Sequence, residues 1–200
     1  MNRYLHLCII PALVFYLLAL AVLNGAGFST LELLRDPPQL TGQSSFLGFL
    51  SNVGVWFWVS GAAVCLSRAS TWEGAHTPLR RVLVFLGLFS LVLAIDDLFM
   101  IHDRYIAEGI VVPLYALALG VFVYRCREII RALDTTSFVL TGVFLALSVA
   151  VDAVPAVLPI PFPLTQAVEE GLKFLGGASW LYFCIRAAAC RAGKIPSSEG

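Results

Sequence analysis

An acidic run in the middle of the chain holds the side chains best suited to chemistry. Asp96 and Asp97 follow a stretch of apolar residues, and His102 and Asp103 come within the next seven positions. A carboxylate inside a bilayer loses hydration free energy, so such residues are rare unless they have a partner or a function. The pair Asp96-Asp97 could hold a cation, and His102 or Asp97 could act as a general base.

Further acidic residues lie near the ends of two later apolar segments. Asp152 lies near the end of one segment, and Glu169 and Glu170 lie near the start of the next. Lys173 is spaced to pair with Glu169 at i,i+4 or with Glu170 at i,i+3. Because five carboxylates face one lysine, we expect shared protons, entering water or a bound cation to lower their repulsion.

These residue types favour a hard cation over zinc or haem. Oxygen ligands suit calcium, magnesium or manganese. His102 is the only histidine expected on its side of the membrane, and neither a His-Glu-x-x-His motif nor the pair of Glu-x-x-His motifs of di-iron bundles occurs, so the histidine-rich zinc and di-iron sites are excluded. The predicted metal ligands are Asp96, Asp97, Asp152, Glu169 and Glu170, and the supporting residues are Ser51, Asn52, Asp103 and Lys173.

The elements that position these side chains are apolar segments long enough to cross a bilayer. The chain has 200 residues, of which 59% are hydrophobic and 13% charged. We therefore predict an all-α membrane helix bundle, with one domain over residues 1–190 and a short polar cytoplasmic tail over residues 191–200. The six predicted transmembrane helices cover residues 4–23, 46–67, 82–102, 109–125, 137–157 and 165–186.

Basic residues set the predicted orientation of these helices. Ten Lys and Arg residues flank the segments on one side and two on the other, which places both termini in the cytoplasm and the protein in the plasma membrane. The five cysteines all fall on the cytoplasmic side or in the inner halves of the helices, so structural disulfides are not expected. Thirteen basic residues balance thirteen acidic ones without forming a patch, which excludes nucleic acid as a partner and leaves membrane lipid.

This topology brings polar residues of four helices to one depth. At a rise of 1.5 Å per residue, Asn52, Asp97, Asp152 and Glu169 each lie roughly 6–9 Å inside the outer boundary. If the third helix continues through residue 102, Asp96 faces the same side as Asp103, seven positions on. We therefore expect one outward-facing acidic site that several helices share.

Three functions are compatible with such a site. The first is a pocket in the outer leaflet that binds a hard cation or a cationic ligand, with metal-dependent hydrolysis of lipid as its enzymatic version. The second is a structural or scaffold subunit in which the acidic cluster only fixes helix packing. The third is an ion- or proton-coupled transporter, although the inner halves of the segments contain no carboxylate or lysine. No serine-hydrolase elbow, P-loop or dinucleotide motif occurs.

Four motifs stand out along the chain: Leu34-Arg35-Asp36-Pro37, Leu50-Ser51-Asn52-Val53-Gly54, Asp96-Asp97-Leu98-Phe99 with His102-Asp103, and Glu169-Glu170-Gly171-Leu172-Lys173. Together they resemble a family of uncharacterised bacterial multi-pass membrane proteins, and this resemblance implies location without an activity. The Ser51-Asn52 pair and the Asp96-Asp97 pair with Met100 are also similar to alkaline ceramidases, a group of membrane hydrolases. The late His-x-x-x-His pair of that group is absent here, so a zinc amidase mechanism is not implied.

Overall fold

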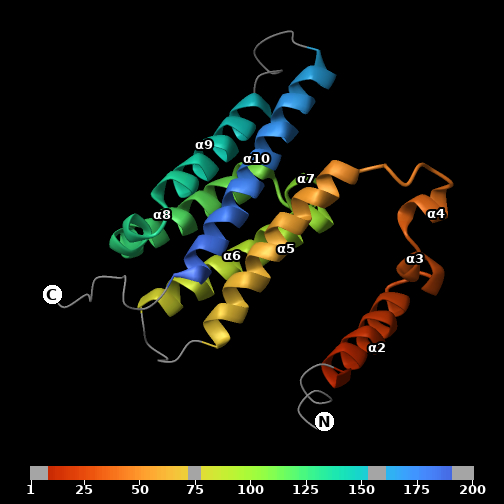
Figure 1. The fold of residues 1–200 in the computed structure, drawn as a ribbon. Coiled ribbons are helices and arrows are strands. Elements are labelled where there is room, and N and C mark those ends of the chain that lie inside the picture. Colours follow the sequence, from red (N-terminus) through yellow and green to blue (C-terminus); the bar gives the residue numbers. More distant parts are fainter. Residues whose placement is uncertain (1–8, 72–77, 153–160, 191–200) are drawn as a thin grey trace. The chain divides into compact units, whose positions relative to one another are not determined.

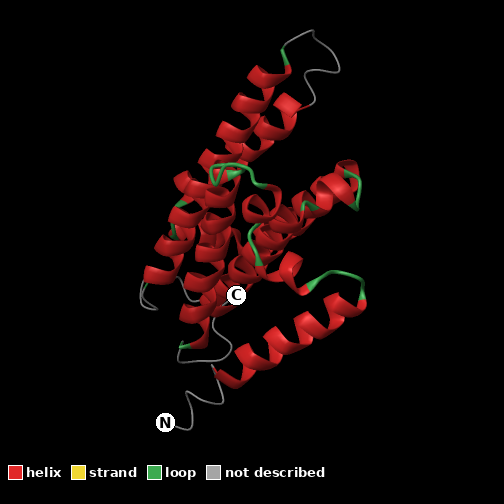
Figure 2. Cartoon of the chain, turned by 90° about the vertical axis from the view of Figure 1, so that its right-hand side faces the viewer, coloured by secondary structure: helices red, strands yellow, loops and turns green. Residues whose placement is uncertain are grey.

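The computed structural model describes residues 9–71, 78–152 and 161–190, with the side chains of Asp103 and Phe162 left out. Within these ranges the chain contains helices and loops and no strand (Figures 1 and 2). This confirms the predicted all-α class. The helices are α2 (Ile10–Gly25), α3 (Thr30–Leu34), α4 (Pro37–Thr41), α5 (Phe49–Ser70), α6 (Pro78–Phe99), α7 (Ile101–Arg104), α8 (Glu108–Ala132), α9 (Thr135–Asp152) and α10 (Phe162–Ala189).

The chain divides into two compact units, Met1–Phe49 and Leu50–Gly200. The single domain predicted over residues 1–190 therefore stays a prediction, and the predicted tail over residues 191–200 lies outside the described part of the chain. In the first unit, Ser29 caps α3 through a capping box with Glu32. The helix α4 then starts at Pro37, in the first-turn position that proline tolerates.

Within the described ranges, four helices are long and apolar enough to cross a membrane: α5, α6, α8 and α9. Four of the six predicted spans are thus confirmed as candidates. The first predicted span corresponds to α2, which has 16 residues and is apolar but shorter. The sixth corresponds to α10, which has 28 residues but carries Glu169, Glu170, Lys173 and Arg186.

The third predicted span is wrong in one respect that matters for the site. It does not continue to residue 102, because α6 ends at Phe99 and Met100 adopts a left-handed backbone with φ 52° and ψ 45°. Such a conformation is uncommon for a residue with a side chain and ends a regular helix. The short helix α7 follows, so the seven-residue spacing of Asp96 and Asp103 no longer places them on one helix face.

Close helix contacts and an aromatic core hold the second unit together. The helices α9 and α10 run side by side (Figure 1), where Gly176 meets Leu145. Trp180 and Phe183 on α10 are fully buried, and the rings of Phe85 and Phe122 stack with their centroids 4.0 Å apart. This rigid packing fixes the ends of α6, α8, α9 and α10, where most of the polar side chains lie.

Candidate functional site

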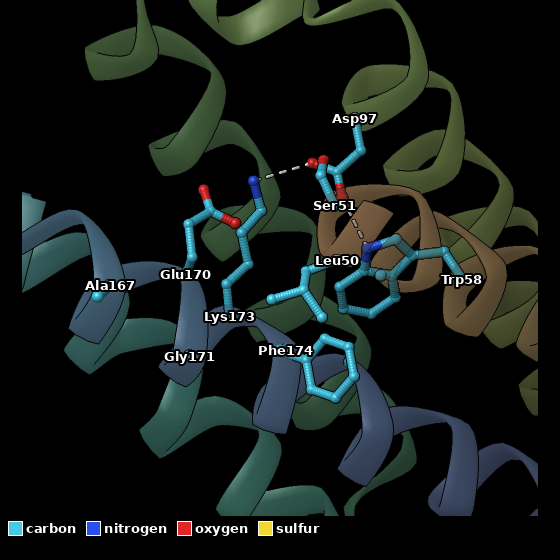
Figure 3. Close-up of a pocket in the computed structure, with 11 residues that line it drawn as sticks. Leu50, Ser51, Trp58, Asp97, Ala167, Glu170, Gly171, Lys173 and Phe174 are labelled. Carbon is cyan, nitrogen blue, oxygen red and sulfur yellow. Dashed lines mark hydrogen bonds and ion pairs between the residues drawn. The ribbon is translucent and has the colours of Figure 1, made fainter. Parts of the chain in front are cut away.

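Asp97 joins three helices through two polar contacts. The indole nitrogen of Trp58 on α5 donates a hydrogen bond of 2.8 Å to one carboxylate oxygen. The Lys173 ammonium on α10 lies 3.1 Å from the other oxygen, and the side chains of Asp97 and Lys173 are 13% and 32% exposed. Figure 3 shows both contacts converging on Asp97. Since each carboxylate oxygen accepts from a different helix, Asp97 is held in one orientation.

Asp96 is buried and turned toward His102. One oxygen accepts a hydrogen bond of 3.0 Å from the backbone N–H of His102, and the other lies 3.0 Å from its Nδ1. The left-handed turn at Met100 makes this possible, because it brings α7 back against the end of α6. A carboxylate beside Nδ1 favours the proton on that nitrogen and leaves Nε2 as the basic one.

A pocket of about 440 Å³ lies between the helices at this end of the second unit. Its polar side chains come from α5 to α10 and include four carboxylates, one lysine and one histidine. Ser148 lines the same pocket and donates a hydrogen bond of 3.1 Å to the backbone oxygen of Glu169, which ties α9 to α10. The charged lining residues are Asp96, Asp97, Glu108, Glu169, Lys173 and His102.

A second pocket of about 250 Å³ lies between α5, α6 and α10. Ser51 and Glu170 line it, with Leu50 and Phe174 close by (Figure 3). Three residues line both pockets: Trp58, Asp97 and Lys173. This hydrogen-bonded group, which we call the Asp97 triad, therefore contributes to both cavities.

The structure brings some of the predicted site residues together and separates others. Glu170 lines only the smaller pocket and accepts from Gln166 Nε2 at 3.4 Å. Asp152 is exposed at the end of α9, one turn beyond Ser148, and is not among the residues lining either pocket. Asn52 is exposed on α5 and lines neither pocket. The side chain of Asp103 lies outside the described part of the chain.

The predicted metal ligands do not converge in the described residues. No group of three or more His, Cys, Asp or Glu side chains is placed there to hold a metal ion. Glu169 lines the larger pocket and Glu170 lines the smaller one. Binding of a hard cation by all five carboxylates stays a prediction.

Sequence reasoning missed Glu108, Tyr115 and Trp58, whose polar groups belong to side chains that line the larger pocket. Glu108 is the first residue of α8 and falls in the short connection between the third and fourth predicted spans. Its spacing of seven from Tyr115 places both residues on one helix face. Trp58 lies in an apolar segment of the sequence, and its indole N–H donates to Asp97. A buried tryptophan usually needs such an acceptor, and this was the signal available in the sequence.

Comparison with known proteins identifies a family. A family model described as a domain of unknown function, DUF8692, matches residues 7–187. No curated protein and no solved structure matches the chain. The match agrees with the expected membership of an uncharacterised family and gives no support to the similarity to alkaline ceramidases.

Proposed function

The chain belongs to the family of the domain of unknown function DUF8692, and for this member we propose a membrane protein that binds an organic cation in the larger pocket. The observation that carries this proposal is the charge of the pocket. Four carboxylates and one lysine line it, so an excess of three negative charges remains when His102 is neutral. A ligand with an ammonium group would lower this repulsion.

The shape and lining of the pocket favour an organic cation over a hard metal ion. A volume of about 440 Å³ falls in the range of sites for small molecules. Tyr115 and Trp58 line it beside the carboxylates, and aromatic faces attract ammonium groups. A calcium or magnesium ion would instead need several oxygen ligands within about 2.0–2.6 Å of one point.

We further propose that the pocket opens on the outer side of the plasma membrane and that six helices span the bilayer. The excess of Lys and Arg at the opposite ends of the helices supports this orientation. Tyr105 is 76% exposed near the pocket end of the unit, and Tyr124 is 78% exposed near the other end of α8. A membrane-impermeant thiol reagent should label Tyr105→Cys in intact cells and Tyr124→Cys only after lysis, and the opposite pattern would reverse the orientation.

A panel of candidate ligands tests the binding proposal. We expect choline and ethanolamine to raise the melting temperature of the purified protein in nanodiscs, and magnesium or calcium to raise it less. Glu108→Gln and Glu169→Gln should remove the shift, whereas Glu128→Gln should keep it, because Glu128 is exposed at the far end of α8. If all three variants keep the shift, the pocket is not the site; if the wild type shows none, the cluster is structural.

A hydrolytic activity on lipid is the second candidate, and the contact between Asp96 and His102 favours it. A carboxylate that orients an imidazole is the usual arrangement of a general base. In this version His102 takes a proton from water beside an ester or amide bond of a lipid. Hydrolysis that His102→Gln abolishes while choline binding persists would support it, and wild-type protein that hydrolyses no ester or amide lipid would exclude it.

A further inference from the structure

The larger pocket is polar at one end and apolar along the rest of its length. Its α8 wall runs from Glu108 through Val112 and Tyr115 to Leu119, positions that share one helix face. At a rise of 1.5 Å per residue this wall is about 16 Å long. The acidic groups reach from Glu108 at the start of α8 to the level of Tyr115, which interacts with Asp96, and an apolar arm extends from there past Ala116 and Leu119 toward the middle of the helices.

The walls from α6 and α9 show the same gradient. On α6, Phe89 and Leu93 precede Asp96 and Asp97, and Phe89 lies about 12 Å along the helix axis from Asp97. On α9, the apolar stretch of the wall begins at Gly142 and leads toward Ser148. The walls from α6, α8 and α9 thus all place the acidic end and the apolar arm at opposite ends of one elongated cavity.

Small residues leave the arm open to the side. Ala116 on α8 and Gly142 and Ala146 on α9 line the pocket, and all three keep exposed surface. Both α8 and α9 are candidate membrane spans, so their outer surfaces face hydrocarbon. A ligand with an alkyl chain could therefore enter between α8 and α9 from the lipid without crossing water.

We propose that the pocket binds an amphiphile whose ammonium head group lies among the carboxylates and whose alkyl chain fills the apolar arm. This inference rests on the proposed function and adds the class of ligand. A small hydrated cation leaves the arm without an occupant, whereas an alkyl chain fills it with apolar contacts. Charge complementarity selects the head group, and the length of the arm selects the chain.

Gly142 offers a direct way to test the occupant of the arm. A Cβ atom built on Gly142 meets no heavy atom within 4 Å, so the first carbon of a side chain there is placed in open space. Gly142→Leu should fill part of the arm and leave the carboxylates untouched. Gly120→Leu is the matched control, because Gly120 is also a helical glycine with open space and does not line the pocket.

The experiment measures binding of alkyltrimethylammonium ions, from ethyl to decyl, to the three proteins in nanodiscs. At each chain length the affinity of the variant is divided by that of the wild type, which cancels partition of the ligand into lipid. For decyltrimethylammonium we expect Gly142→Leu to weaken binding at least about fourfold, the effect of excluding one methylene from an apolar site. For the ethyl compound we expect no change, and Gly120→Leu should match the wild type throughout.

Two outcomes overturn the inference, and they are distinguishable. If the short ions bind and Gly142→Leu leaves the decyl compound unaffected, the organic-cation pocket stands and the amphiphile is wrong. If the short ions do not bind the wild type, the proposed function itself fails and the inference fails with it.

Discussion

The ammonium of Lys173 lies 3.1 Å from the carboxylate of Asp97 and joins α10 to α6. The spacing in the sequence had favoured partners for Lys173 on its own helix. The observed contact means that the fixed cation of the site also holds two helices together. Loss of the Lys173 charge should therefore lower the stability of the protein and raise its affinity for a cationic ligand.

We predict that Lys173→Met destabilises the protein and tightens the binding of organic cations. The partly buried Asp97 loses its ion-pair partner, at a cost of about 1–3 kcal/mol, because the pair is not fully desolvated. Removing a like charge from the pocket should strengthen choline binding by about 1 kcal/mol, or about fivefold. Thermal melting and choline titration measure the two effects, and a parallel loss of both would contradict a binding role for the carboxylates.

Two tryptophan variants separate a charged acceptor from a neutral one. Trp58 donates to the Asp97 carboxylate at 2.8 Å, and Trp180 donates to the Ser90 hydroxyl at 2.7 Å. Trp58→Phe should cost about 1.5–3 kcal/mol and Trp180→Phe about 0.5–1.5 kcal/mol beyond the shared loss of ring volume. Only Trp58→Phe should also alter choline affinity. Equal effects of the two variants on affinity would show that Asp97 does not act on the ligand.

A glycine substitution tests the close approach of α5 and α6. A Cβ atom on Gly87 would lie 2.5 Å from Cγ of Leu66 and 3.3 Å from the Leu66 backbone nitrogen, so the Leu66 side chain must move and its backbone must give slightly. We expect Gly87→Ala to lower stability by about 1–3 kcal/mol. The matched variant Gly120→Ala meets no atom within 4 Å and should be neutral or stabilise by up to about 1 kcal/mol. A neutral Gly87→Ala would contradict the described packing.

The capping box of α3 predicts a dependence on pH outside the spanning helices. Hydrogen bonds from the Ser29 hydroxyl and backbone N–H lower the pKa of Glu32 below its usual value of 4.5. Because the folded pKa is the lower one, the cap contributes fully above pH 4.5 and is lost as pH falls through the lowered pKa.

Hydrogen exchange can follow this cap through the Glu32 amide, which donates to Ser29 Oγ. Its protection should fall as acid protonates Glu32, after the change in intrinsic exchange rate is taken into account. Ser29→Ala should remove the protection at neutral pH, and Glu32→Gln should make it independent of pH. Protection in the wild type that does not change down to pH 2 would contradict the cap.

The sequence predicts the helices better than it predicts the contacts between them. Hydropathy places α5, α6, α8 and α9, because spanning length and apolar composition are properties of each segment alone. The capping box at Ser29 was also predictable, since its partners are three residues apart. The left-handed turn at Met100 was not, because no glycine marks it and the contact of Asp96 with His102 accompanies it.

The site residues that were predicted are likewise those that can be recognised within a single segment. The adjacent acids and Lys173 stand out as charges in apolar segments, and the larger pocket includes Asp96, Asp97, Glu169 and Lys173. Depth alone could not show that Asn52 is exposed or that Glu170 lines a different pocket from Glu169, because rotation about the helix axis depends on packing.

Titration of choline against its neutral carbon isostere, dimethylbutanol, tests the central claim most directly. The two ligands share size and shape and differ in charge, so the comparison isolates the effect of the carboxylates. Using isothermal calorimetry on the protein in nanodiscs, we predict that choline binds at one site at least about tenfold more tightly than the isostere. Glu169→Gln should remove most of this preference. Equal affinity of the wild type for the two ligands, or a preference that Glu169→Gln leaves intact, would contradict the account.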